Sequence, residues 1–280
     1  MVKQISPEAG SSPSDEGLFD DPEIISTINT DYGSYLNAVA CLNDEEIWTE
    51  GNERTMNIFR ISQGSLLKSI TTKSGCIPED IAVTKHTDSG GRTVIIVRNK
   101  KIKTVLSVFS LKDWVPGHIC TTHYGELLVV SNDNKERKIV RYSGFAEKQT
   151  IKFDDESKPL FSYGYTKYIS ENKILDICVA DNNAKAVVVV NQARKLRFRY
   201  NGHKSALGSN AFKPVGITTD SKSHILTTDS VKNCVHIIDQ NGQFLCFLNC
   251  GLHKPCTDTN DHLLVVECAS KHVKKIKYQQ

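Results

Sequence analysis

Short apolar segments alternate with polar turns along most of this chain. The clearest example is the stretch 213–248, KPVGITTDSKSHILTTDSVKNCVHIIDQNGQFLCFL. Its apolar runs are those of four short strands, and the turns between them are rich in Asp, Asn, Ser and Gly. A single four-stranded meander leaves two edges unpaired and two faces uncovered. The pattern therefore predicts that further units of the same kind pack beside it.

Similar units recur along the chain. Their first strands are centred near residues 39, 81, 119, 169, 217 and 255, which is a spacing of 38 to 50 residues. A repeat of about 40 residues with four strands in each unit is typical of a β-propeller. The last unit lacks a fourth strand, while Glu23–Ile28 is a strand that belongs to no unit. Joining the two closes a ring.

We therefore predict an all-β, six-bladed β-propeller over residues 23–278, with the N-terminal strand completing the last blade. Blades two and six are expected to be abbreviated. Blade two offers only the polar segment 86–91 (HTDSGG) where its second strand is expected, and blade six has a poor first strand at 255–257. Residues 1–22 are rich in Ser, Pro, Gly and acidic residues, which predicts a disordered tail.

The fifth unit also carries a recognisable motif. Its segments PVGI (214–217), ILTTD (225–229) and VHIID (235–239), followed by Gly242, resemble an NHL repeat. The span from about residue 23 to 278 resembles the C-terminal propeller of tripartite-motif (TRIM) proteins of the NHL type, and most of all the expanded TRIM-like set of bivalve molluscs. The resemblance implies a propeller of the ubiquitin pathway that recognises a protein or RNA partner.

In that family the ubiquitin-ligase activity resides in an N-terminal RING, which B-boxes and a coiled coil follow. This sequence contains no Cys-x-x-Cys pair, and no heptad run precedes residue 30. The resemblance therefore implies a non-catalytic module, and we expect no cofactor. The main prediction is a module that binds a protein partner through one propeller face. The alternatives are RNA binding through basic loops and, less well supported, a metal-dependent hydrolase or lyase.

Charge and cysteine usage refine this picture. The net charge is +3, but residues 1–30 contribute −5, so the remainder carries +3 − (−5) = +8. A basic body permits an anionic partner without requiring one. Nine cysteines, an odd number, are scattered through strand-like segments, and the N-terminus lacks an apolar signal sequence. We expect a cytoplasmic protein with reduced thiols and no membrane partner; its oligomeric state is left open.

One cysteine cluster has the composition of a metal site. Cys246, Cys250, His253 and Cys256 follow the spacing C-x3-C-x2-H-x2-C, which is compact enough for tetrahedral zinc. However, Cys246 lies within a predicted strand, where alternation is expected to bury it. Chance clustering is therefore the preferred interpretation.

Acidic residues recur at the ends of predicted second strands, namely Glu50, Asp181, Asp229 and Glu267. Such carboxylates are able to coordinate a metal in a propeller hydrolase. They also accept backbone N–H groups in Asx-type turns and thereby stabilise the hairpin. Because the position repeats with the unit, the second interpretation is preferred.

The turns between second and third strands supply the predicted binding residues. In a propeller these turns gather on one face around the axis, where Asn, Lys and Arg can contact a partner or the phosphates and bases of RNA. The simpler interpretation is that Asn and Lys make good turns, and those loops contain no aromatic residue for stacking. The predicted partner-binding residues are Asn52, Arg54, Lys135, Arg137, Asn183, Lys185, Lys232, Asn233 and Lys271.

Overall fold

The computed structural model describes the chain from residue 17 to its end, with gaps. The described ranges are 17–33, 35–71, 80–85, 92–98, 101–104, 108–109, 115–132, 137–144, 146–164, 167–203, 212–249 and 253–280. Their regular structure consists of β-strands. Within these ranges, no helix has the length and apolar character required to cross a bilayer.

Four-stranded antiparallel sheets are the repeating unit of the fold. The first contains β2 (Leu36–Cys41), β3 (Glu46–Gly51), β4 (Thr55–Arg60) and β5 (Ser65–Thr71), and the second β6 (Asp80–Lys85), β7 (Arg92–Arg98), β8 (Lys101–Thr104) and β9 (Val108–Phe109). The third contains β10 (Val115–Thr121), β11 (Leu127–Asn132), β12 (Arg137–Ser143) and β13 (Ala146–Ile151), and the fourth β14 (Lys167–Glu171), β15 (Ile177–Asp181), β16 (Ala186–Val190) and β17 (Leu196–Tyr200). The fifth contains β18 (Pro214–Thr219), β19 (Ile225–Asp229), β20 (Cys234–Ile238) and β21 (Phe244–Leu248). The last contains β22 (His253–Thr257), β23 (Leu263–Glu267), β24 (His272–Gln279) and β1 (Leu18–Asn29).

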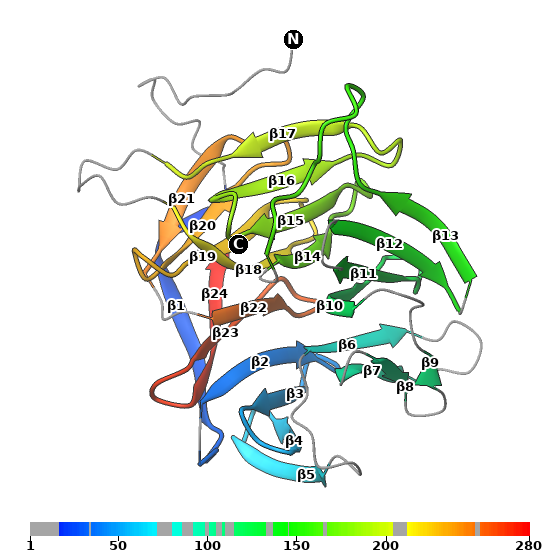
Figure 1. The fold of residues 1–280 in the computed structure, drawn as a ribbon. Helices are drawn as coiled ribbons and strands as arrows, with labels where there is room; N and C mark the ends of the chain where they lie inside the picture. Colours follow the sequence, from blue (N-terminus) through cyan, green and yellow to red (C-terminus); the bar gives the residue numbers. More distant parts are fainter. Residues whose placement is uncertain are drawn as a thin grey trace.

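The sheets are arranged as a closed ring. In each sheet the first strand lies innermost, and the inner strands β2, β6, β10, β14, β18 and β22 each contact the next, with β22 returning to β2. Figure 1 shows these six strands around the centre and the outer strands β5, β13, β17 and β21 at the periphery. The prediction of an all-β propeller is confirmed.

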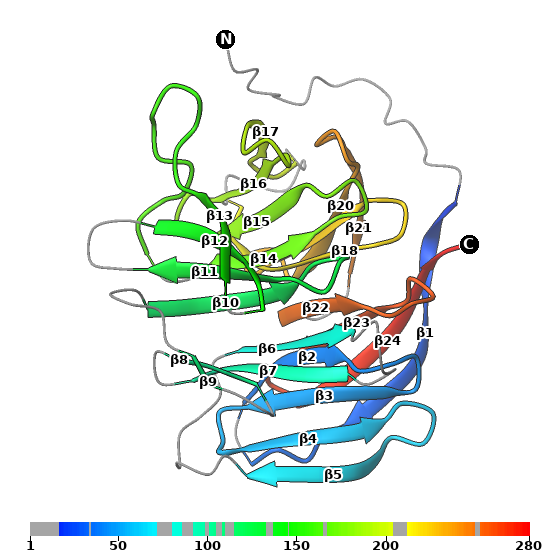
Figure 2. The same ribbon diagram turned by 90° about the vertical axis from the view of Figure 1, so that its right-hand side faces the viewer.

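The two ends of the described chain meet in the last sheet. Strand β1 pairs antiparallel with β24, and in this register Ile24 lies opposite Ile276 and Ile28 opposite Val273. Figure 2 shows the two strands side by side. The N-terminal strand therefore completes the last sheet, as predicted. It begins at Leu18, inside the segment that was expected to be a tail.

The strand pairing corrects the predicted number of six blades and the expected abbreviation of blade six. Among the described residues, five sheets are full blades with an outer strand of five or more residues; the sheet β6–β9 is reduced, since β8 has four described residues and β9 two. The reduction does not lie in the second strand, because β7 (Arg92–Arg98) pairs with β6 along its length. Blade six is complete, because β22 and β1 supply its inner and outer strands.

The core lies between neighbouring sheets. Strand β16 is buried along its entire length because both faces of its sheet are covered, which explains its continuous apolar run, AVVVV. Val187 and Val189 of this strand pack against Ile217 and Ile225 of the next sheet.

Candidate functional site

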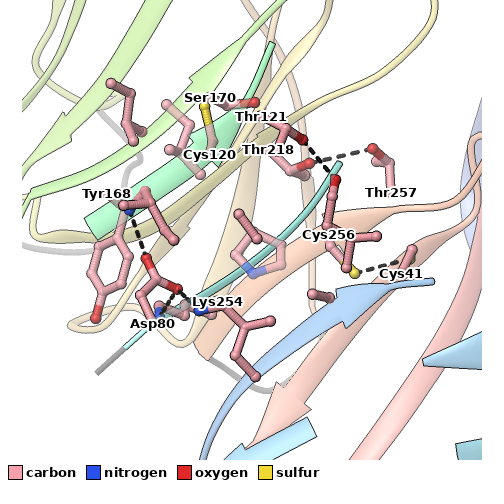
Figure 3. Close-up of a pocket in the computed structure, with 18 of the residues that line it drawn as sticks. Cys41, Asp80, Cys120, Thr121, Tyr168, Ser170, Thr218, Lys254, Cys256 and Thr257 are labelled. Atoms are coloured by element: carbon pink, nitrogen blue, oxygen red, sulfur yellow. Dashed lines mark hydrogen bonds and ion pairs between the residues drawn. The ribbon is translucent and has the colours of Figure 1, made fainter. Parts of the chain in front are cut away.

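A cavity of about 300 Å³ lies at the centre of the ring, and all six inner strands line it (Figure 3). Threonine hydroxyls join several of these strands across the sheet boundaries. Thr121 donates to the Val83 carbonyl (2.9 Å), Thr219 to that of Glu171 (2.9 Å) and Thr257 to that of Thr219 (2.8 Å). These hydroxyl groups thus link neighbouring inner strands by hydrogen bonds.

A charged cluster lies at one end of this cavity. Nζ of Lys254 lies 2.6 Å from Oδ1 of Asp80, and Nδ1 of His118 lies 3.1 Å from Oδ2. The backbone N–H groups of Ile81 (2.8 Å) and Ile119 (2.9 Å) also donate to this carboxylate. The His118 ring stacks on Tyr168 at a centroid distance of 3.9 Å. The negative charge of Asp80 is therefore compensated by Lys254, and each of its two carboxylate oxygens has hydrogen-bonding partners.

The ionisation of this cluster follows from its burial and its partners. Burial alone would raise the pKa of Asp80, but the charge of Lys254 and the hydrogen bond from His118 together bring that pKa well below its ordinary value. Burial lowers the pKa of His118, and the nearby Lys254 charge lowers it further. Burial would also lower the pKa of Lys254, but Asp80 and Glu50 raise it above its usual range. At neutral pH the cluster consists of a carboxylate, an ammonium and a neutral imidazole.

The cluster lies toward one particular face of the ring. Asp80, Tyr168 and Lys254 stand at or next to the beginning of their inner strands. In an antiparallel meander the second strand ends where the first begins, so the turns between second and third strands lie at this same end. The described turns that were predicted to share a face therefore do so, at the charged end of the cavity.

The described members of these turns differ in exposure. Asn52, Arg54, Asn183, Lys185 and Asn233 are exposed, and Lys232 and Lys271 are half-buried. The predicted residue Lys135 lies outside the described residues.

Three of these residues occupy one geometric position. Lys185, Asn233 and Lys271 each immediately precede the third strand of their sheet, and their φ angles of 53°, 56° and 62° are left-handed. Asn tolerates this region better than most residues, whereas Lys adopts it at a cost of about 1 kcal/mol. This repeated conformation supports the interpretation of these residues as turn formers.

Arg137 is not a turn residue. It is the first residue of β12 and only 6% exposed, and its Nε donates to the Gly164 carbonyl (3.2 Å). Its guanidinium carbon lies 4.3 Å from the centroid of the Tyr163 ring. Arg137 therefore packs against the Tyr163 ring and is too buried to contact a partner itself.

Two exposed tyrosines stand beside these turns. Tyr35 and Tyr163 are 63% and 64% exposed, and both lie in the connections that lead into inner strands. The Tyr35 carbonyl accepts the backbone N–H of Asn52 (2.8 Å), and a Cβ at Gly164 would lie 2.6 Å from the Asn183 side chain. Neither tyrosine was predicted from the sequence, because both lie outside the turns between second and third strands. We use the name turn face for the set Tyr35, Asn52, Arg54, Tyr163, Asn183, Lys185, Lys232, Asn233 and Lys271.

The acidic residues at the ends of second strands are engaged in the scaffold. Asp181 accepts the N–H of Ser162 (2.7 Å) and lies 3.5 Å from Nζ of Lys167. Asp229 accepts the N–H of Val231 (2.9 Å) and lies 3.5 Å from Nε2 of His236.

The other two carboxylates lie beside cations. Glu50 is buried, 3.9 Å from Nζ of Lys254, and Glu267 is paired with Lys274. All four carboxylates thus stabilise turns or compensate buried charges.

The predicted zinc cluster is not assembled by its described members. Cys246 packs between the fifth and last sheets, whereas Cys256 packs between the last and first sheets. Cys250 and the His253 side chain lie outside the described residues. Among those that are described, no group of three or more His, Cys, Asp or Glu side chains is arranged to hold a metal ion.

The opposite face is formed by the turns between first and second strands, and its polar side chains bond to one another. Asp220 accepts the N–H of His224 (2.8 Å) and is 2.7 Å from its Nδ1; Asp258 and His262 repeat this arrangement. Asp220 also accepts a hydrogen bond from the Tyr278 hydroxyl of the last sheet (3.0 Å).

Further bonds on that face join neighbouring sheets. The backbone N–H of Ser221 donates to Asp261 (2.9 Å), and that of Thr259 donates to Asp44 (3.2 Å). The corresponding hydroxyls donate to the same carboxylates.

Comparison with known proteins identifies the fold alone. No protein-family model matches the chain. No curated protein matches it either. Among solved structures it is similar to virginiamycin B lyase from Staphylococcus aureus, with 12% identity, a TM-score of 0.61 and coverage of 92% of this chain and 99% of the other.

Two further propellers are similarly related. The calcium-binding protein regucalcin from Agrobacterium tumefaciens matches at 11% identity and a TM-score of 0.63, with coverage of 91% of this chain and 94% of the other. The WD40 β-propeller domain of Doa1 matches at 11% identity and a TM-score of 0.61, with coverage of 92% and 98%. One propeller architecture thus occurs in a lyase, a calcium-binding protein and a WD40 domain, so the function has to be argued from this chain's own residues.

Proposed function

We propose that the protein is a non-catalytic recognition module that binds a protein partner through the turn face. The observation that carries the proposal is the pair of exposed tyrosines, Tyr35 and Tyr163, beside the exposed cations Arg54 and Lys185. Tyr and Arg are enriched at protein interfaces because they combine a large contact area with hydrogen bonding. The positive charge favours a partner that presents carboxylates.

Catalysis is less well supported by the same geometry. A general base or metal ligand needs a free lone pair, whereas the cavity carboxylate Asp80 is engaged by Lys254, His118 and two backbone N–H groups. The similarity to a lyase concerns the fold and does not favour a hydrolase or lyase over a recognition module.

We also propose that the propeller is of the NHL type. The NHL-like segment PVGI lies in β18 and ILTTD lies in β19. VHIID lies in β20 and the one residue that follows this strand, as it would in an NHL repeat. This supports an NHL-type propeller similar to those of TRIM proteins. We also propose that the protein is located in the cytoplasm.

RNA is the second candidate partner. Tyr35 and Tyr163 supply stacking surfaces that the turns between second and third strands lack, and Arg54 and Lys185 are able to contact phosphates. A protein remains the preferred partner because, among the described residues of this face, the exposed cations Arg54 and Lys185 are few and alternate with Asn residues.

A capture experiment tests the proposal. Immobilised full-length protein is incubated with native lysate, with and without ribonuclease, and bound material is compared among variants. The tyrosine pair variant Tyr35→Ala/Tyr163→Ala and the cation pair variant Arg54→Ala/Lys185→Ala should each reduce capture of the main partner at least five-fold. Matched controls on the opposite face are Tyr124→Ala and Lys173→Ala, because both side chains are exposed there.

The outcomes separate the alternatives. Reduced capture by the turn-face variants, with the controls unchanged and ribonuclease without effect, supports a protein partner. Loss of capture after ribonuclease treatment shows that RNA is the partner. Unchanged capture by both turn-face variants excludes the turn face as the binding site.

A further inference from the structure

Two thiols meet where the first and last sheets of the ring adjoin. Sγ of Cys41 lies 3.1 Å from Sγ of Cys256, although the residues are 215 positions apart in the sequence. Cys41 is the last residue of β2, and Cys256 lies in β22. Figure 3 shows the two side chains pointing toward each other across the gap between these inner strands.

Both cysteines line the central cavity. Cys41 and Cys256 are half-buried and belong to its lining. Among the described cysteines, Cys268 packs against the same apolar cluster, but its thiol donates to the Leu36 carbonyl (2.8 Å). The geometry therefore singles out one reactive pair among these thiols.

We propose that Cys41 and Cys256 are a redox site at which a reversible disulfide links the first and last sheets. A peroxide is the oxidant class. One thiolate attacks a peroxide oxygen to give a sulfenic acid and one water; the second thiol then displaces the hydroxyl to form the S–S bond and a second water. The two thiols together lose two electrons and two protons, and hydrogen peroxide is reduced to two waters. A dithiol or glutathione then reduces the disulfide back to two thiols.

The consequence lies at the closure of the ring. In the reduced protein this closure is non-covalent and consists of the pairing of β1 with β24 and the packing of β2 against β22. A bond between Cys41 and Cys256 closes a loop that contains most of the chain, and long loops lose the most entropy in the unfolded state when they are cross-linked. Oxidation therefore holds the ring closed during partial unfolding.

The environment of the pair limits the reaction rate. The hydrogen bond with Cys256, burial and the charge of Asp258 in the following turn raise the pKa of the Cys41 thiol; Lys275 of β24 opposes them. Since the thiolate is the nucleophile, disulfide formation should be slow at neutral pH and faster at pH 8.5.

Peptide mapping tests the site directly. The full chain is reduced, treated with a small excess of hydrogen peroxide at pH 8.5, alkylated and digested without reduction. Mass spectrometry should find the Cys41–Cys256 cross-linked peptide, and the number of free thiols should fall from nine to seven. A dithiol should restore all of them. The melting temperature of the oxidised protein should rise by about 5 °C or more.

Variants make the result specific. Cys41→Ser and Cys256→Ser should each abolish both the cross-link and the oxidative rise in melting temperature. Cys120→Ser is the matched control, since Cys120 is a half-buried cavity thiol of β10, and it should behave as the wild type. Failure to detect the Cys41–Cys256 peptide at pH 8.5, or its replacement by a cross-link to Cys268, overturns the proposal whether or not the turn face binds a partner.

Discussion

The two faces of this propeller differ in how their described polar residues are engaged. On the opposite face, the carboxylates of Asp44 and Asp261 accept hydrogen bonds from turns of neighbouring sheets, and Asp220 is bonded to Tyr278 of the last sheet. On the turn face, Lys185 and Arg54 are exposed to solvent. The opposite face thus carries hydrogen bonds between neighbouring sheets, whereas the turn face combines such bonds, from Lys232 and Lys271, with the exposed side chains of Arg54 and Lys185.

This difference identifies the face on which function is to be sought. A side chain that already forms intramolecular bonds has to break them to bind a partner, which costs most of the energy gained. For an exposed tyrosine or cation, the main cost of binding is the conformational entropy that its side chain loses. Substitutions on the opposite face should therefore affect stability, and those on the turn face should affect capture.

The largest effect is expected from Asp220→Ala. This buried carboxylate accepts hydrogen bonds from His224, Tyr278 and Gln279, so its removal leaves several buried donors without an acceptor. The free energy of unfolding should fall by about 3–4 kcal/mol, measured by urea denaturation. The control is Asp239→Ala, which removes acceptors only from Asn241 and Gln243 of its own turn and should cost about 1 kcal/mol. Equal losses would show that the bonds between sheets contribute nothing.

A smaller loss is expected from Lys254→Met at the turn-face end of the cavity. The substitution leaves Asp80 buried without its cation, although His118 still contacts it and is able to take up a proton. The free energy of unfolding should fall by about 2–3 kcal/mol. Adding Asp80→Asn to this variant should recover part of the loss, because the uncompensated charge is then removed. A double variant less stable than Lys254→Met would contradict this explanation.

Acidification should destabilise the protein through histidines on the turn-face side. Burial lowers the pKa of His236, with Asp229 opposing, and burial together with Lys254 lowers that of His118. In the unfolded chain both titrate near pH 6.5. As the pH falls from about 7 to 5, the unfolded chain therefore binds protons that the folded protein does not, and stability falls by roughly 1 kcal/mol for each histidine.

Urea denaturation at a series of pH values measures this slope. The variant His118→Gln/His236→Gln should show a flatter pH dependence between about pH 5 and 7. A slope equal to that of the wild type would place the acid sensitivity elsewhere in the molecule.

The smallest effect is expected from Lys185→Gly. Lys185 has a φ of 53°, a region in which Gly has no steric penalty, so the substitution should leave stability unchanged or raise it by about 0.5–1 kcal/mol. The control Lys173→Gly, in an exposed turn of the opposite face, should lower stability by a few tenths of a kcal/mol. Capture of a partner should fall in Lys185→Gly alone. This combination would separate the role of Lys185 in binding from its role in the turn.

Local patterns were sufficient to predict most of the fold. Alternating apolar residues and Asp- or Gly-containing turns located the strands, and the unmatched strand at Glu23–Ile28 predicted how the last sheet is completed. The pattern failed at β9, because a strand of two residues carries too few positions to show alternation.

The candidate site was less predictable because its contacts are non-local. Asp80 and Lys254 are 174 positions apart, and Cys41 and Cys256 are 215 apart. Only the closed ring brings these pairs together. The sequence did reveal the position of the turns between second and third strands. It did not reveal that Tyr35 and Tyr163 join those turns from other loops, since neither belongs to a repeated position.

The pairing of β1 with β24 determines how the ring responds to mechanical force. Leu18 lies opposite Gln279 in this antiparallel pair, so the outer ends of the two strands are neighbours. Tension applied between these two points would unzip the pair from one end and load its hydrogen bonds one after another, whereas a shearing geometry would load them together. The last sheet would therefore separate at low force while the other sheets keep their shape.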